Sequence, residues 1–195
     1  MRQMRRVSAV LLSACAVLVV GAAGPQTMAT SAGATVAASS TGRQSVDGPS
    51  PREPGVGTTL SLTGIGSGER LDVTVVKVVD PARTANEFLV PDAGNRYVAV
   101  QFRLKNTGDD PYKDSPSNGA ALVDADGQHF DAALIAETTA GPSFPGALSI
   151  SPGDTALGFI TFELPTSARP VQLQFSMNSG FSDDVGEWSL VSPPK

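Results

Sequence analysis

The chain has 195 residues, a formal net charge of −5 and 41% apolar residues, which leaves room for one globular domain and some additional chain. Its 19 acidic residues outnumber its 14 basic ones. An acidic chain is repelled by nucleic acid and by anionic membranes, so we expect neither as a partner of the mature domain.

Residues 1–34 have the pattern of a secretory signal peptide. Arg2, Arg5 and Arg6 precede an apolar run over residues 7–23, and small residues follow. This run is marginal for crossing about 30 Å of hydrocarbon, so a retained membrane helix is the weaker alternative. Without the three arginines, 11 basic residues stand against 19 acidic ones, a net charge of −8. We therefore expect a secreted, extracellular protein.

Cys15 offers a second interpretation of the export signal. It follows Leu12-Ser13-Ala14, which fits the small-residue box before a lipid-modified bacterial cysteine. A lipoprotein usually becomes polar directly after that cysteine, whereas this apolar run continues through residues 16–20. We expect free secretion, and a lipoprotein anchored on the outer face of the membrane through Cys15 is the alternative. In both cases the globular part has no cysteine, so its core must stabilise it without disulfides.

The chain after the signal divides into two parts by composition. Residues 35–55 are rich in Ala, Ser, Gly and Pro and show no helical or strand period. This composition predicts a flexible linker. Residues 56–195 are then the folded domain, which is long enough to bury one core.

Residues 95–105 give the clearest strand signal. Four apolar residues fall at every second position, namely Val98, Val100, Phe102 and Leu104. The positions between and beside them are Tyr97, Ala99, Gln101, Arg103 and Lys105, which would lie on the other face of a strand. A period of two predicts a strand with one buried and one exposed face. Asn106-Thr107-Gly108-Asp109 predicts a turn after it, because Asn and Gly accept positive φ and Asp can accept bonds from turn amides.

Shorter runs predict the remaining strands, at residues 58–62, 71–79, 120–124, 128–130, 156–164 and 171–177 and around Trp188 and Leu190. A change of phase near Val75-Val76 predicts a bulge or burial on both sides. Residues 132–136 fit one helical turn, and residues 141–146 predict an irregular loop. Seven to eight short strands without an amphipathic helix predict an all-β protein, an immunoglobulin-like antiparallel β-sandwich.

Several short motifs follow one another between residues 71 and 190. They are Gly94-x-Arg96-Tyr97-Val98-Ala99-Val100, Asn106-Thr107-Gly108-Asp109 with Tyr112, Leu122-x-Asp124-x-Asp126-Gly127 with Phe130, Pro152-Gly153-Asp154, and Gly158-x-x-x-Phe162-x-x-Pro165. In this order they resemble a bacterial secreted immunoglobulin-like (telokin-like) domain family of unknown function, related to the immunoprotective extracellular antigen fold. The resemblance implies an exported β-sandwich, often a lipoprotein or tethered by a low-complexity segment. It implies no known reaction and no catalytic residue.

The residues give little support to catalysis or to a bound transition metal. His129 is the single histidine, and no serine lies in the G-x-S-x-G pattern. From Val56 onward only His129 and Met177 are soft metal ligands, too few for zinc or copper. Glu137, Glu163 and Glu187 occur singly, without neighbouring aromatic platforms for sugars. We expect no catalytic residue, no metal and no cofactor.

Calcium stays open, because several aspartates lie in predicted turns. These are Asp109, Asp110, Asp114, Asp124, Asp126 and Asp154. The segment from Asp124 is not an EF-hand loop, because His129 stands where the glycine should be and Ile135 where the glutamate should be. Aspartate in a turn usually bonds to backbone amides, so a structural role is the first expectation.

The remaining candidates for a site are aromatic and proline residues in two loops. Residues 109–118 contain Tyr112, and residues 131–147 contain Phe144 between Pro142 and Pro145. Loops on a rigid sandwich are common binding positions, and these residues are candidate contacts. The alternative is that both aromatic rings fold back onto the core.

We therefore interpret the chain as a secreted, non-enzymatic module that binds a protein or a cell-envelope component. The alternatives are a lipid-anchored accessory lipoprotein and an enzyme with an unrecognised site.

Overall fold

The computed structural model describes residues 53–134 and 136–191. The predicted signal peptide, Cys15 and nearly all of the predicted linker lie outside the described residues. No helix among the residues described is long and apolar enough to cross a membrane.

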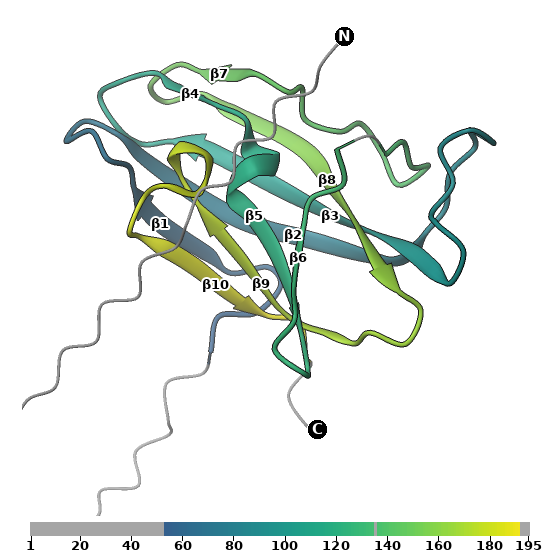
Figure 1. Cartoon of the computed structure of the whole chain (residues 1–195). Coiled ribbons are helices and arrows are strands. Elements are labelled where there is room, and N and C mark those ends of the chain that lie inside the picture. The colour runs from purple at the N-terminus through teal and green to yellow at the C-terminus, as the bar shows by residue number, and fades with distance from the viewer. Residues whose placement is uncertain (1–52, 135, 192–195) are drawn as a thin grey trace, which may run out of the picture. The chain divides into compact units, whose positions relative to one another are not determined.

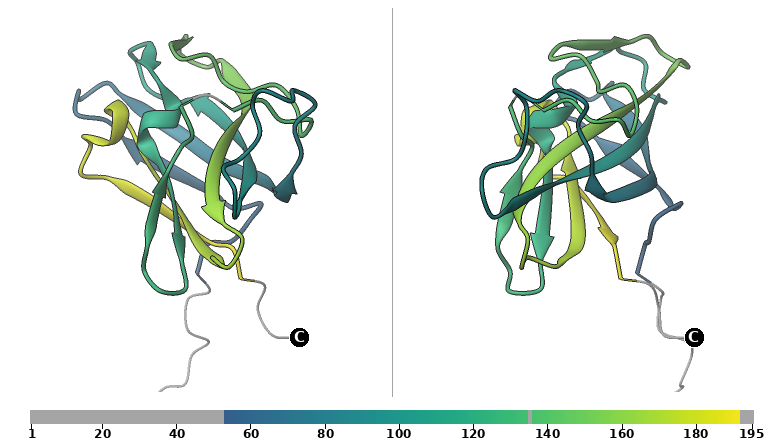
Figure 2. Two further views of the ribbon diagram at one scale, coloured as in Figure 1. Left: turned by 45° about the vertical axis from the view of Figure 1, so that its right-hand side comes forward. Right: turned by 90° about the vertical axis from the view of Figure 1, so that its right-hand side faces the viewer.

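Two four-stranded antiparallel sheets form the domain and lie face to face (Figures 1 and 2). The first sheet has the order β1 (Thr59–Thr63), β2 (Arg70–Ala82), β3 (Asn95–Asn106) and β8 (Thr155–Pro165). The second has the order β10 (Val185–Ser189), β9 (Pro170–Ser176), β5 (Ala120–Asp124) and β6 (His129–Asp131). The predicted all-β antiparallel sandwich is confirmed.

A third, two-stranded sheet pairs β4 (Tyr112–Asp114) with β7 (Leu148–Ile150). Two short 3₁₀ helices complete the described elements, η1 (Pro116–Gly119) and η2 (Asn178–Gly180). The eight strands predicted from the sequence are present, and β4 and β7 were not predicted. Each of them has three residues, too few for alternation to be visible.

The core lies between the two large sheets and is centred on β3. Val98, Val100, Phe102 and Leu104 are each 0% exposed, as their alternation predicts. Phe102 meets Phe175 of β9 across the sandwich, with ring centroids 5.7 Å apart. Because apolar burial is the main favourable term in folding, this contact between the sheets holds the two layers together.

The predicted bulge in β2 is confirmed. Val75 pairs with Phe102 of β3, and the next residue of β2 in register is Lys77, which pairs with Gln101. The intervening Val76 is the extra residue. It returns β2 to the correct phase, so that Val78 packs against the main core.

The other face of β3 is not fully exposed, and this corrects the prediction. Tyr97 is 3% exposed and Ala99 0%, and with Phe159 they form a second apolar cluster. Ala136 and Ala140 pack against this cluster from a distant part of the chain. Alternation identifies the two faces of a strand, but it does not show which loop covers the second face.

Residues 132–133 and 142–144 pair with the edge of β8. The N–H of Ala133 donates to the Thr161 carbonyl (2.8 Å), and the N–H of Phe144 donates to the Phe159 carbonyl (3.1 Å). Ala132 forms an isolated bridge with Phe162 instead of starting the helical turn considered for residues 132–136, so that prediction is wrong. The segment covers an edge that would otherwise offer unpaired backbone groups to other chains.

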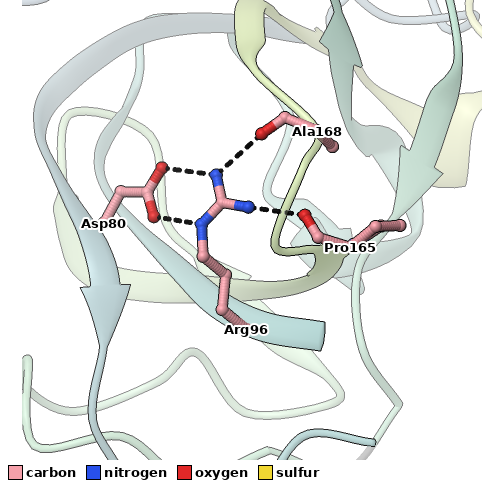
Figure 3. A network of polar contacts seen from close by, with 4 residues as sticks. All are labelled: Asp80, Arg96, Pro165 and Ala168. Atoms are coloured by element: carbon pink, nitrogen blue, oxygen red, sulfur yellow. Dashed lines mark hydrogen bonds and ion pairs between the residues drawn. The ribbon is translucent and has the colours of Figure 1, made fainter. Parts of the chain in front are cut away.

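Arg96 of the Gly94-x-Arg96 motif joins three segments, β3, β2 and the turn that links β8 to β9 (Figure 3). Its guanidinium donates to both carboxylate oxygens of Asp80, at 2.6 and 2.9 Å. It also donates to the carbonyls of Pro165 and Ala168, at 2.6 and 3.0 Å, in the turn that links β8 to β9. Such a planar, bidentate arrangement suits arginine. Arg96 therefore has a structural role.

Candidate functional site

Two hollows lie beside the covered edge of β8, and together we call them the edge surface. One has a volume of about 440 Å³ and is lined by Leu89, residues 132–134 and 136–137, and Phe144. The other has a volume of about 570 Å³ and is lined by residues 85–88 and 137–139. Glu137 lines both, so the two hollows are neighbours.

Two apolar side chains of the edge surface are highly exposed. Leu134 is 100% exposed and Phe88 86%. Their loops are fixed to one another, because the N–H of Thr139 donates to the Arg83 carbonyl at 2.7 Å. Side chains of this size on positioned loops are the usual anchors of binding surfaces.

Two hydroxyl groups beside these hollows lack a partner among the described residues. They are the buried Oγ1 atoms of Thr161 and Thr138. A buried hydroxyl without a hydrogen bond typically costs about 1–3 kcal/mol, and an ordered water is a common partner of such a group. The exposed apolar side chains, and not these buried hydroxyls, are the groups that a ligand at the edge surface can reach.

The charged groups of the edge surface are carboxylates. Glu87 and Glu137 line its hollows, and no Lys, Arg or His is among the described residues lining them. Hydroxyl and amide side chains line the hollows beside these carboxylates, among them Asn86, Thr139 and Ser117. The edge surface therefore combines polar hollows with exposed apolar side chains at its rim.

The predicted loop residues lie in different environments. Phe144 lines a hollow and packs against the main core, where Gly158 makes room for its ring. Tyr112 is 4% exposed, which is the folded-back alternative, and its hydroxyl donates to Asp114 (3.4 Å). Pro142 and Pro145 are exposed. Whether these residues contact a ligand stays a prediction.

With this geometry established, comparison places the chain in a family. The family model described as Domain of unknown function (DUF4352) matches residues 67–185, more than half of the chain. The chain belongs to this family. The predicted resemblance to a bacterial immunoglobulin-like family of unknown function is thereby confirmed. No curated protein matches the chain.

Solved structures share the fold of this DUF4352 domain. The secreted protein MPT63 of Mycobacterium tuberculosis has a TM-score of 0.50 and 20% identity, covering 73% of this chain and 99% of that one. The yjhA protein of Bacillus subtilis has a TM-score of 0.49 and 14% identity, covering 71% and 99%. An uncharacterized β-sandwich protein of Clostridium difficile has a TM-score of 0.41 and 17% identity, covering 72% and 95%. The likeness to MPT63 shows a shared fold.

Two of the turn aspartates in the DUF4352 domain accept bonds from backbone amides. Asp124 Oδ1 accepts from the N–H groups of Asp126 (3.0 Å) and Gln128 (2.9 Å), which closes the β5–β6 turn. Asp114 Oδ2 accepts from the N–H of Ser179 at 2.8 Å. Within residues 53–134 and 136–191, no three His, Cys, Asp or Glu side chains are grouped to hold a metal. His129 is exposed on β6.

The two tyrosines give a prediction for alkaline pH. Burial, followed by the charge of Asp114, raises the pKa of Tyr112, and burial, followed by the charge of Glu163, raises the pKa of Tyr97. An unfolded phenol has a pKa of about 10. Above that pH the two tyrosines lose their protons in the unfolded chain but keep them in the folded domain. Their contribution to the free energy of unfolding should therefore be constant below about pH 10 and fall above it.

Near-ultraviolet absorbance of tyrosinate measures this directly. The folded domain should show tyrosinate only at a higher pH than the same chain in denaturant. Ionisation of both tyrosines near pH 10 in the folded domain would contradict the burial of these rings.

Proposed function

We propose that the mature chain is an exported, non-enzymatic binding module whose edge surface contacts a protein or a component of the cell envelope. The observation that carries the proposal is the exposure of Leu134 and Phe88, 100% and 86%, beside two neighbouring hollows. Exposed apolar anchors on positioned loops suit binding.

Two further facts support export. Residues 1–34 have the composition of a signal peptide, and the solved structure of MPT63 is that of a secreted protein with a similar fold. A lipid anchor at Cys15 is the alternative form of the proposal, and it would keep the same binding domain at the membrane surface.

The experiment compares capture by three forms of the domain, covering residues 35–195. The unchanged domain, Phe88→Ala and Val191→Ala are immobilised and exposed to culture fluid and envelope extract of the native bacterium, and bound components are quantified by mass spectrometry. Val191 is the control, because it is also apolar, is 58% exposed and lies outside the edge surface.

A component that depends on the edge surface should bind about 5–30-fold more weakly to Phe88→Ala, which corresponds to about 1–2 kcal/mol for an anchor residue. It should bind equally to the unchanged domain and to Val191→Ala. The proposal fails if both variants bind every captured component as strongly as the unchanged domain does. It also fails if the two variants weaken the binding of every component equally.

A further inference from the structure

A second exposed apolar surface lies at one end of the sandwich. The first and last residues that the structure describes lie at the opposite end. The N–H of Ser189 donates to the Pro54 carbonyl at 2.7 Å, so both ends of the described domain meet there. Strands β1 and β10 run between that point and two loops, residues 64–69 and 178–184 (Figure 1). We call these two loops the distal loops.

The distal loops expose large apolar side chains. Phe181 is 79% exposed and Ile65 68%, and Val185, directly after the second loop, is 47% exposed. Ile65 and residues 182–184 line a hollow of about 480 Å³. A partner that covered these side chains would remove apolar area from water, which is the main source of affinity at a protein surface.

Hydrogen bonds hold the distal loops in one arrangement. Asn178 Oδ1 accepts from the N–H of Ile65 (2.9 Å), and Asp184 Oδ2 accepts from the N–H of Thr63 (2.8 Å). Asn178 and Ser179 have φ of 54° and 56°, a left-handed conformation that residues other than glycine adopt at a cost. The bonds keep this conformation in the free domain, so little entropy is lost there on binding.

The charge around these apolar side chains is mainly negative. Glu69, Asp109, Asp110, Asp114, Asp183 and Asp184 are the carboxylates on the segments that form this end, and Arg70, Lys105 and Lys113 are the basic residues on the same segments. The N–H of Asp109 donates to the Gly68 carbonyl at 2.9 Å, which fixes the acidic turn against the first distal loop. An exposed apolar patch with an acidic rim is complementary to an apolar partner with a basic rim.

We propose that the distal loops dock a cationic peptide segment that carries apolar side chains. Phe181 and Ile65 contact its apolar side chains, and Asp183 with the acidic turn at Asp109 faces its basic groups. This surface is separate from the edge surface, and it does not depend on the function proposed above.

The test uses a short fluorescent leucine–lysine peptide and the folded domain, with binding followed by fluorescence anisotropy. Phe181→Ala should weaken binding about tenfold, and Asp183→Asn should weaken it less and reduce its salt dependence. Val191→Ala is the control and should leave binding unchanged, because Val191 is 58% exposed and lies at the opposite end of the sandwich, outside both surfaces. A leucine–glutamate peptide of the same length should not bind.

Three results would overturn the proposal. They are absence of binding by the leucine–lysine peptide, equal weakening by Phe181→Ala and Val191→Ala, and binding that depends on salt but not on Phe181. The last result would show attraction by the overall negative charge alone. Because Phe181 is 79% exposed, its replacement should leave the melting midpoint unchanged, and this is measured for each variant.

Discussion

Replacement of Phe102 by alanine should lower the free energy of unfolding by about 3–5 kcal/mol. Phe102 is 0% exposed and meets Phe175 across the two sheets, so the shorter side chain leaves a cavity at the centre of the core. The rigid pairing of β3 with strands on both sides limits how far the cavity can close. Urea denaturation of the two proteins measures the difference.

Arg103→Ala is the control for this prediction. Arg103 is the next residue of β3 and is exposed, so its replacement should change the free energy of unfolding by no more than about 0.5 kcal/mol. Equal losses in Phe102→Ala and Arg103→Ala would mean that the facing of β3 is wrong.

Gly108→Ala should also be strongly destabilising, by about 3 kcal/mol. A Cβ at this position would overlap the Gly68 carbonyl oxygen and lie 2.6 Å from the backbone nitrogen of Arg70. These are backbone atoms, which cannot move without breaking the bonds between the N–H groups of residues 107–110 and the carbonyls of Gly68 and Arg70. The turn motif therefore requires glycine for close approach of two backbones.

Gly146→Ala is the matched control for this glycine. Nothing lies within 4 Å of a Cβ at Gly146, and its φ is outside the left-handed range. Its replacement should be neutral or slightly stabilising. Thermal melting of the two variants compares them, and a Gly108→Ala protein as stable as Gly146→Ala would refute the close approach.

The sequence predicts the sandwich well, because each long strand has one continuous buried face. Alternation at Val98–Leu104 gives the correct face of β3, and the phase change at Val75-Val76 gives the bulge. Gly108 was predicted to supply positive φ, yet it is not among the residues with positive φ, and its role is contact with Gly68. Contacts between residues this far apart in sequence leave no local pattern.

The candidate site was only partly predictable. The loop that contains Phe144 was identified, because an aromatic residue among prolines suggests an irregular surface segment. The edge surface itself was not, because Leu134 was considered as part of a helical turn. Ala133 and Phe144 instead pair with β8, and Leu134, directly after the first of these pairs, is fully exposed.

A photo-crosslinking residue at position 134, in the protein produced by its native bacterium, tests the binding proposal most directly. Leu134 is 100% exposed at the edge surface, whereas Ser61 is exposed on β1, at the opposite edge of the same sheet from β8. Illumination should give a discrete adduct from position 134 and not from position 61. Adducts of the same size and yield from both positions would contradict the account. Absence of an adduct from position 134 would also contradict it.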